Sequence, residues 1–408
     1  MSKIAIFSFS PVIVNGERKL LNYYEAISLE FQKRGHRVLN LITNNFIVDP
    51  WNGENTPISN DEEKRVLSSL KKFNPDLIIS FNNSKLDKVV KFFDCPIVIC
   101  EADTPEYFSS KKDLKRNSDR YYYFYFTKNG KKKIISQYGA SEKKIFYISN
   151  ATAVKNKAER KINDIVFIGT LYDRFKIESK KNKINFLNYR SSIQRYEALK
   201  KLDVFNLKIY TNRVPSLYLD FKNKIETKPI YSLQQLEKIY NSSLIGFNIS
   251  HAQAKNECYS WRVLDILASN ALLMCEENNF LKKDFGKKIS RQLYSSKYDL
   301  YKKVKFILKN KNFVKDQVCF QNDIINKKFR WKQRIQYIES IFNLKVESST
   351  KNKIRNQVIV LNRNTKIKYN FLTKFIGNLI VNLLYKIKQN KKLNKNILRI
   401  KFFIKNSR

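Results

Sequence analysis

The chain has 408 residues, 43% of them hydrophobic and 13% aromatic, which is enough apolar material for two ordinary domains and excludes wholesale disorder. Lys and Arg outnumber Asp and Glu by 79 to 36, and the formal net charge of +43 favours anionic partners such as nucleic acid, acidic lipid or phosphorylated small molecules. The alternative is that most of these lysines are merely solvated.

Cysteine usage and hydropathy bear on the compartment. The five cysteines are odd in number and none stands in a C-x-x-C spacing, which argues against a disulfide framework or a structural zinc site. The N-terminus lacks the apolar core of a signal peptide, and no stretch reaches the roughly 18–20 apolar residues of a membrane-spanning helix. We therefore expect a cytoplasmic protein.

The first third of the chain alternates short apolar runs with helical patterns. Buried strands are predicted at residues 3–9, 36–43, 76–81, 95–103, 121–126 and 144–148. Helices are expected between them, as at 20–34 and 61–73. Repeated strand–helix units whose strands are apolar throughout predict a parallel sheet covered on both faces. We assign residues 1–153 to this first Rossmann-like domain.

A charged segment at 154–162 has the composition of a linker, and the strand–helix pattern restarts after it. Strands are predicted at 164–170, 207–212, 244–250 and 271–276, and helices at 232–243 and about 259–269. The predicted fold class is thus α/β, with two doubly wound parallel-sheet domains facing a cleft. The second domain is assigned to residues 163–345.

Residues 346–408 form a predicted basic amphipathic helical tail. From residue 351 onward there are sixteen Lys or Arg and no Asp or Glu. Apolar side chains recur every four residues at Phe371, Phe375, Leu379, Leu383 and Ile387, which indicates a helix with one apolar stripe. Such a helix could pack on the body, lie on an anionic membrane surface or bind nucleic acid.

Loops after the strands of a doubly wound sheet are the expected place for a ligand. After the strand at 164–170, Gly169 would let backbone approach a phosphate closely and Arg174 could bind it, unless they are only a turn glycine and a solvated arginine. After the strand at 244–250 comes His251, which is structural if it has no ligand. His36 lies at the opposite end of its sheet, and we expect it to be structural.

The stretch ECYSWRVLDILASNALLMC, residues 257–275, carries acids at Glu257 and Asp265. If Glu257 lies in the loop before a helix that contains Asp265, both carboxylates can face the cleft. One would accept hydrogen bonds from sugar hydroxyls and the other would hold a ribose diol. Backbone amides around Ser260, at the helix start, would favour a diphosphate, to which Arg262 adds charge. These parts together fit a nucleotide-diphosphate sugar.

This stretch resembles the donor-binding signature of two-domain, GT-B-fold glycosyltransferases, and most of all the group 1-like enzymes related to the spore-maturation (CgeB-type) proteins. The residues that match the signature are Asn248, Ser260, Arg262, Asp265, Ala268 and Ser269. Asp265 stands where the family usually has Glu, and Asn270 where it has Gly; Asn also tolerates a left-handed turn. The resemblance covers about residues 75–342 and includes a closing helix in FRWKQRIQYIESIF that crosses back to the N-terminal domain.

The resemblance implies a metal-independent glycosyltransferase without a cofactor, moving a sugar from a nucleotide-diphosphate donor to a glycan or lipid-linked acceptor in surface polysaccharide synthesis. It would act in the cytoplasm, with the tail at residues 351–408 able to hold it to the inner membrane face. The implied donor-site residues are Gly169 and Arg174 at the diphosphate, Asp265 at the ribose, Asn248, His251 and Glu257 near the sugar, and Ser260 at the helix start.

A base for the acceptor hydroxyl should come from the first domain, where Asp103 is best placed, with Glu101 and Glu106 behind it. The alternative is that Asp103 caps a helix beginning near Pro105. Two other functions stay open. A basic nucleic-acid-binding protein could use Tyr121–Phe124 as a stacking platform, but no established motif supports it and we regard a nucleic-acid partner as the weaker hypothesis. A sugar-nucleotide epimerase of the same fold is the other.

Overall fold

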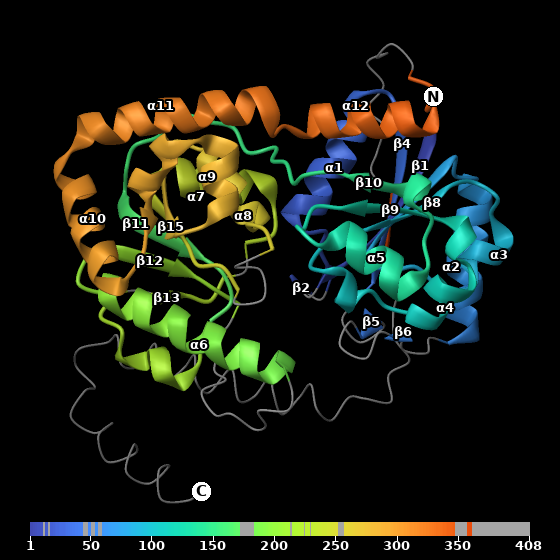
Figure 1. The fold of residues 1–408 in the computed structure, drawn as a ribbon, viewed down its shortest axis with the longest axis horizontal. Helices are drawn as coiled ribbons and strands as arrows, with labels where there is room; N and C mark the ends of the chain where they lie inside the picture. The colour runs from blue at the N-terminus through green and yellow to red at the C-terminus, as the bar shows by residue number, and fades with distance from the viewer. Residues whose placement is uncertain are drawn as a thin grey trace, which may run out of the picture.

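The computed structural model describes residues 1–10, 13–14, 17–43, 48–49, 54–55, 59–171, 183–212, 214–223, 225–228, 230–251, 257–346 and 357–360. Two parallel sheets, each flanked by helices, lie side by side (Figure 1). This is the predicted α/β architecture with two doubly wound sheets. Arg174 and residues 361–408, including the predicted helical stripe, lie outside the described residues.

The first sheet has seven strands in the order β10-β9-β8-β7-β1-β4-β17, all parallel. Its strands are β1 (Lys3–Phe9), β4 (Arg37–Thr43), β7 (Leu77–Phe81), β8 (Ile97–Cys100), β9 (Tyr121–Tyr125), β10 (Ile145–Tyr147) and β17 (Gln357–Val360). The chain first moves from β1 outward to β4 and then returns to the other side of β1 with β7. The strand order therefore reverses between β1 and β7, and in doubly wound sheets such a reversal point is where ligands bind, beyond the carboxyl ends of the strands.

The second sheet has six parallel strands in the order β13-β12-β11-β14-β15-β16. They are β11 (Asn163–Ile168), β12 (Leu207–Tyr210), β13 (Ile225–Glu226), β14 (Ser243–Asn248), β15 (Leu272–Glu276) and β16 (Leu293–Tyr294). This is the strand order of a dinucleotide-binding fold, and it reverses between β11 and β14.

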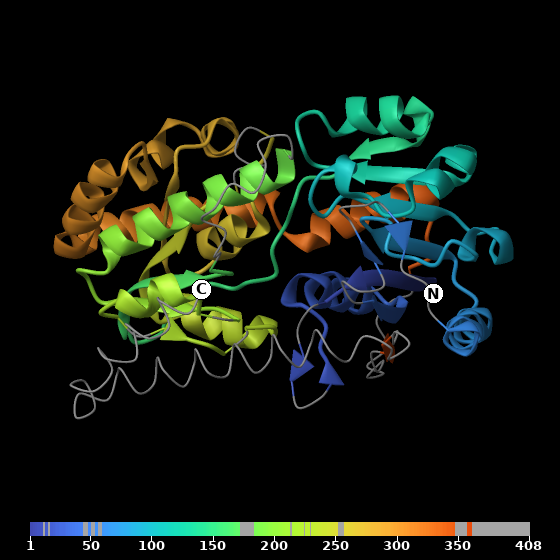
Figure 2. The ribbon, with the colours of Figure 1, turned by 90° about the horizontal axis from the view of Figure 1, so that it is seen from below.

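Helices cover both faces of each sheet, and apolar clusters fill the space between (Figures 1 and 2). Beside the first sheet stand α1 (Asn22–Lys33), α2 (Asn60–Phe73), α3 (Val89–Phe92), α4 (Lys111–Arg116) and α5 (Gly130–Tyr138). Beside the second stand α6 (Lys183–Leu202), α7 (Leu233–Asn241), α8 (Trp261–Leu267), α9 (Asn279–Phe285), α10 (Lys297–Lys309) and α11 (Lys311–Lys328). Two short hairpins, β2 (Ile13–Val14) with β3 (Glu17–Arg18) and β5 (Val48–Asp49) with β6 (Glu54–Asn55), accompany the first sheet.

The last helix in the described ranges, α12 (Trp331–Phe342), returns from the second half to pack on the first, as the resemblance implies (Figure 1). Its Glu339 accepts two hydrogen bonds from Arg34, of 2.6 and 2.5 Å, and lies 2.9 Å from the ring nitrogen Nε2 of buried His36. Burial alone would raise the pKa of Glu339, but the bonds from Arg34 and His36 outweigh it and hold that pKa below its ordinary value. His36 thus has a structural role, as predicted.

Residues 357–360, which the sequence pattern places in the basic tail, are instead a strand of the first sheet. β17 pairs with β4, and Arg65 of α2 donates a hydrogen bond of 2.7 Å to the carbonyl of Val360. Four residues pairing with a strand more than 300 positions away leave no local pattern to recognise. None of the helices in the described ranges is both long and apolar enough to cross a bilayer.

Candidate functional site

The carboxyl ends of β11 and β14, where the strand order of the second sheet reverses, bring together residues from distant parts of the sequence. Gly169 follows β11, and a methyl group added to it would lie 2.9 Å from the ring of Phe167 and 3.6 Å from Nη1 of Arg262. The guanidinium of Arg262 therefore lies beside the backbone of Gly169, next to the ring of Phe167. A cation next to a glycine is a suitable place for a phosphate group.

Asn248 ends β14 and reaches toward α8. Ser260, which precedes the first residue of α8, donates from its hydroxyl to Oδ1 of Asn248 over 3.3 Å. The amide Nδ2 of Asn248 is fully buried and has no hydrogen-bond partner in the described structure. A buried donor left unpaired costs about 1–3 kcal/mol, so a ligand that accepts from it is favoured.

Asp265 lies within α8 and contacts Thr152, in the segment where the chain passes from the first half to the second. Its carboxylate accepts a hydrogen bond of 2.7 Å from the hydroxyl of Thr152, and the backbone N–H of Thr152 donates to the carbonyl of Phe329. Burial raises the pKa of Asp265 to about 6, against the bond from Thr152 and the charges of Arg262 and Arg330. The carboxylate thus faces the crossing segment beside Arg262.

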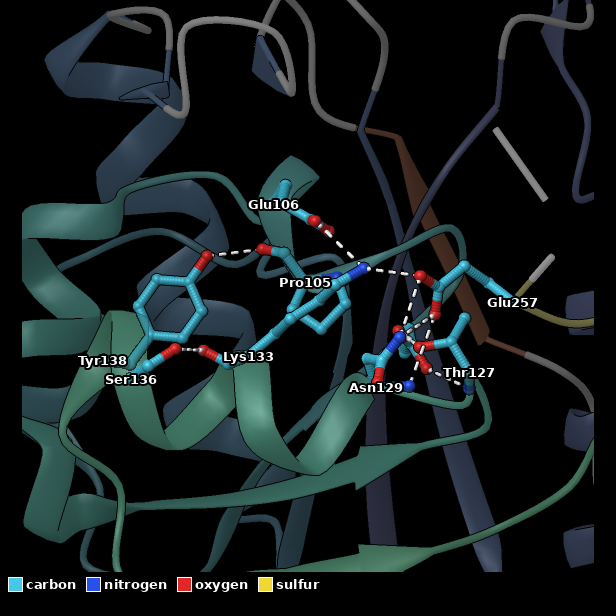
Figure 3. Close-up of polar contacts among 9 residues, drawn as sticks. Pro105, Glu106, Thr127, Asn129, Lys133, Ser136, Tyr138 and Glu257 are labelled. Carbon is cyan, nitrogen blue, oxygen red and sulfur yellow. Dashed lines mark hydrogen bonds and ion pairs between the residues drawn. The ribbon is translucent and has the colours of Figure 1, made fainter. Parts of the chain in front are cut away.

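Glu257 lies in the loop before α8, as expected, but its contacts are with the first half of the molecule (Figure 3). Its carboxylate accepts from the backbone N–H of Asn129, at the start of α5, over 3.3 Å, and lies 3.3 Å from Nζ of Lys133. Its own carbonyl accepts from the N–H of Lys128. A carboxylate at a helix N-terminus is stabilised by the helix dipole. Because Glu257 belongs to the second half and α5 to the first, this contact joins the two halves.

Lys133 shares its ammonium group between the two halves. It lies 3.0 Å from a carboxylate oxygen of Glu106 and 3.3 Å from one of Glu257. Burial would lower the pKa of Lys133, but the bonds and charges of Glu106 and Glu257 raise it overall. Glu106 is therefore engaged in holding this contact.

His251 follows β14 and is half-buried. Burial lowers the pKa of His251 to about 4, with a further contribution from the charge of Arg195, so its ring is neutral at neutral pH. Arg195, on α6, is 4% exposed and donates to the carbonyls of Thr170 and Ile249 over 2.5 and 3.2 Å. Sequence reasoning missed Arg195, which ties the loops after β11 and β14 together; inside a helical pattern it carries no distinguishing signal.

Asp103 follows β8 and is held by Asn82, whose Nδ2 donates to its carboxylate over 3.0 Å. The side chain keeps contact with solvent, yet the protein packed around it desolvates the carboxylate and raises its pKa. The residue before the 3-10 turn at Pro105–Tyr107 is Thr104, and no side chain caps that turn. Asp103 is therefore not the helix cap considered as its alternative role.

Cys258 shows how near the acids of the two halves lie. Burial, together with the charges of Glu101, Glu257 and Asp103, raises the pKa of the Cys258 thiol to about 12. Two acids of the first half and one of the second thus act on the same thiol. Asp103 and Glu257, predicted on opposite sides of the cleft, share this surrounding.

Glu101 organises the loop after β9. It accepts from the N–H groups of Phe126 and Thr127 over 2.7 and 2.9 Å and from the Thr127 hydroxyl over 2.6 Å. Burial raises the pKa of Glu101 to about 7, in spite of these bonds. Since the next residues, Lys128 and Asn129, contact Glu257, Glu101 positions the loop that meets the second half.

The reversal point of the first sheet carries a cluster of buried polar side chains that sequence reasoning missed. Asn82 and Asn83, after β7, have left-handed backbone with φ of 47° and 56°. Four buried side-chain atoms here, at the end of β1, after β7 and after the turn at 105–107, have no hydrogen-bond partner in the described structure: Ser8 Oγ, Asn83 Oδ1, Ser84 Oγ and Ser109 Oγ. The consecutive asparagines after a strand were the available signal.

Two further expectations can be compared with the structure. Asn270 does not have a positive φ, so the left-handed turn considered for it is absent; its N–H instead donates to the side chain of Asn241. Arg174, expected beside Gly169, lies outside the described residues. Among the described residues, no group of three His, Cys, Asp or Glu side chains could hold a metal ion.

Comparison with known proteins bears on the fold and on the second half of the chain. Residues 193–340 match the model of a family described as "Glycosyl transferase-like". No curated protein matches the chain. Similar solved structures cover most of both chains: T4 phage BGT in complex with UDP and Mn²⁺ (13% identity, 84% of this chain, 100% of that one, TM-score 0.52), WaaG, a glycosyltransferase involved in lipopolysaccharide biosynthesis (10%, 83%, 99%, 0.53), and a glycosyltransferase from Rickettsia africae ESF-5 (14%, 84%, 98%, 0.51). At these identities the likeness is one of fold.

Proposed function

We propose that the chain is a glycosyltransferase that takes a sugar from a nucleotide-diphosphate donor bound where β11 and β14 separate. The observation that carries the proposal is the grouping of Gly169, Asn248 and Arg262 at that point. A glycine backbone, an unpaired buried amide and a guanidinium meet there, at the ligand-binding position of a doubly wound sheet. The glycosyl-transferase-like match spans Asn248 and Arg262.

In this proposal Arg262 neutralises the diphosphate beside Gly169, with Arg174 as a second candidate, and Ser260 and Asn248 supply hydrogen bonds. Asp265 accepts from the ribose diol, exchanging its bond from Thr152 for one from the ligand. With arginine taking the diphosphate charge, we propose that the enzyme needs neither metal nor cofactor. UDP is the first nucleotide to test, because a T4 phage neighbour of the same fold holds it.

The donor sugar would lie between the halves, near His251 and Glu257. His251, neutral at neutral pH because its pKa is lowered, can donate or accept a hydrogen bond with the sugar without adding charge. Glu257 reaches that region from the second half while bound to the start of α5. Glu257 would therefore keep this position near the donor sugar only while the two halves are in contact.

The acceptor would lie over the first sheet, where Ser8, Asn83 and Ser109 offer unpaired polar atoms suited to a hydroxylated ligand. Asp103 is the proposed base for the attacking hydroxyl, since its raised pKa lies closer to neutral than that of an ordinary aspartate. We propose a glycan or lipid-linked acceptor in surface polysaccharide synthesis, at the inner face of the cytoplasmic membrane.

Donor binding is the test. Calorimetry and thermal melting with UDP, GDP, CMP and their sugar conjugates should identify one nucleotide sugar that stabilises the protein, because a ligand that binds only the folded state raises its melting temperature. Arg262→Gln and Asn248→Ala should each weaken binding about 10-fold or more. Arg291→Gln, which removes an exposed arginine outside the site, is the matched control.

Three further arms sharpen the result. Excess chelator should leave binding unchanged if no metal takes part. Asp103→Asn should retain donor binding and lose transfer to a lipid-linked acceptor. When duplex DNA is offered to the wild-type protein as the acceptor, it should receive no sugar. Failure of every nucleotide sugar to bind at millimolar concentration would sink the proposal.

A further inference from the structure

The outer surface of α10 carries aromatic and basic side chains in one stripe. Successive residues of a helix are turned by about 100°, so positions 298, 302, 305, 306 and 309 fall within an arc of about 100°. All five side chains on that arc are exposed, and we call them the α10 face: Tyr298, Lys302, Lys305, Phe306 and Lys309. The opposite side of α10 is buried in the second core through Leu300, Val304 and Ile307.

The two aromatic residues are unusually open to solvent for their type. Tyr298 is 62% exposed and Phe306 is 51% exposed. Val204, in the turn after α6, is 64% exposed, and α6 packs against α10. Exposed apolar side chains between charges are typical of a binding surface.

Positive charge dominates this part of the chain. Residues 297–315 contain seven lysines and a single acid, Asp299. Asp299 is already engaged by Lys303 at 3.1 Å and by the N–H of Ser295. The lysines of the α10 face therefore meet no counter-charge on their own helix.

We propose that the α10 face binds an anionic lipid surface. An amphipathic helix with lysines around exposed aromatic rings has the composition of an interfacial helix: the rings enter the boundary between headgroups and acyl chains and the lysines contact anionic headgroups. A single-stranded nucleic acid would instead need open ring faces for stacking. The ammonium of Lys302 covers the face of Tyr298 at 4.4 Å, and Phe306 packs edge-to-face with Phe313 at 5.3 Å.

The position of α10 is compatible with catalysis. α10 lies at the end of the second half farthest from the first sheet in both views (Figures 1 and 2). A membrane bound there leaves the space between the halves accessible. The proposal does not depend on the proposed glycosyl transfer, and it differs from membrane binding through residues 361–408 because it assigns the contact to a described helix of the body.

Flotation of the full chain with vesicles tests this. Binding to phosphatidylglycerol-containing vesicles should exceed binding to pure phosphatidylcholine vesicles and weaken with salt. The triple variant Lys302→Gln, Lys305→Gln, Lys309→Gln should bind about 100-fold less tightly at low salt, because each lysine near an anionic surface contributes about 1 kcal/mol, which is roughly a fivefold change in affinity. Tyr298→Ser with Phe306→Ser should also weaken binding while keeping the charge.

The matched control removes three exposed lysines from α2 in the first half, Lys64→Gln, Lys71→Gln and Lys72→Gln, and should retain vesicle binding. Equal losses in both triple variants would show that only total charge matters and would overturn the proposal. So would unchanged binding of the α10 variants, which would place the contact elsewhere. Preference for single-stranded nucleic acid over anionic vesicles, lost in the α10 variants, would overturn it in favour of the other partner. In a further arm, Phe306→Trp fluorescence should be quenched by brominated lipid.

Discussion

At the scale of single residues, the candidate donor site depends on side chains whose surroundings differ from water. Asp265 is the clearest case, because burial raises its pKa from 3.8 to about 6. Asn248 holds a buried amide without a partner, and Arg262 stands beside Gly169. The buried carboxylate and the unpaired amide each cost stability unless a ligand compensates, which is the usual condition of a binding site.

Asp265→Asn should raise stability at neutral pH and weaken donor binding. Because the folded pKa is above the unfolded one, the folded protein holds the proton more tightly between about pH 4 and 6, and stability falls as pH rises through that window. Above it the full penalty applies, about 1–3 kcal/mol after allowance for partial solvent contact. Asn cannot ionise and can still accept from Thr152. Urea unfolding at pH 5 and pH 7.5 measures the difference.

The control is Asp119→Asn, an exposed aspartate whose replacement should leave the pH dependence unchanged. If Asp265→Asn shows the same slope of stability against pH as the wild type, the carboxylate is not held in the surroundings described here. Calorimetric titration of the variant with the donor then separates the two roles, since a structural aspartate would not change donor affinity.

At the scale of elements, the seven-residue helix α8 carries Arg262 and Asp265 and begins directly after Ser260, so its position on the sheet decides the site. That position is set by Gly246 in β14. A methyl group added there would lie 2.5 Å from Cγ2 of Ile266, a distance that real Cβ atoms do not reach. The glycine thus allows α8 to lie directly against the strand whose end bears Asn248.

Gly246→Ala should lower stability by about 1–3 kcal/mol, because the extra methyl overpacks a buried contact and moves α8 outward. Donor affinity should fall as well, since Arg262 would move away from Gly169. Chemical unfolding and donor titration of the same preparation measure both effects.

The double variant Gly246→Ala with Ile266→Ala is the matched test of this cause. Ile266→Ala alone creates a cavity and costs about 2–5 kcal/mol, but in the double variant the new methyl fills part of the space. The two changes should therefore cost clearly less together than the sum of the single variants. Simple additivity would show that the two side chains do not compete for space.

At the scale of the whole molecule, the two halves are joined by more than the chain crossing at Thr152 and Phe329. Tyr23 of α1 stacks on Trp261, the first residue of α8, with an interplanar angle of 15°. Glu257, in the loop before α8, makes a further contact with Lys133 of α5 in the first half. The start of α8 is thus flanked by contacts with the first half, which links the candidate donor site to the relative position of the halves.

A double-mutant cycle of Glu257→Gln and Lys133→Gln should give a coupling energy of about 0.5–2 kcal/mol, because both groups are four-fifths buried and each lies near the other's charge. Each single variant should also increase the radius of gyration measured by small-angle X-ray scattering, as the halves separate more readily. Lys132→Gln, an exposed neighbour on α5, should show no coupling with Glu257. A coupling energy near zero for Lys133 would contradict this contact.

Much of the fold was predictable because its signals are local. Apolar runs predicted six strands of the first sheet and four of the second, and the helical patterns predicted α1, α2, α7 and α12 within a few residues. The two-residue strands β13 and β16 were not predicted, because they are too short to show a pattern. The placement of Glu257 before α8 and of Asp265 within it also followed from spacing along the chain. Arg195, Asn83 and β17 were not recognised, because their meaning lies in partners distant in sequence.

By itself the sequence determined that strands and helices alternate, that the chain contains two such series, and which strand-end loops bear Gly169, Asn248 and the acids around α8. These are consequences of hydrophobic periodicity, which acts over a few residues. Only the tertiary structure decided that Arg262 faces Gly169, that Glu257 binds α5 of the first half and that Asp265 faces Thr152. Strand order, and the packing of α8 on Gly246, set these distances, and neither is encoded in the spacing of neighbouring residues.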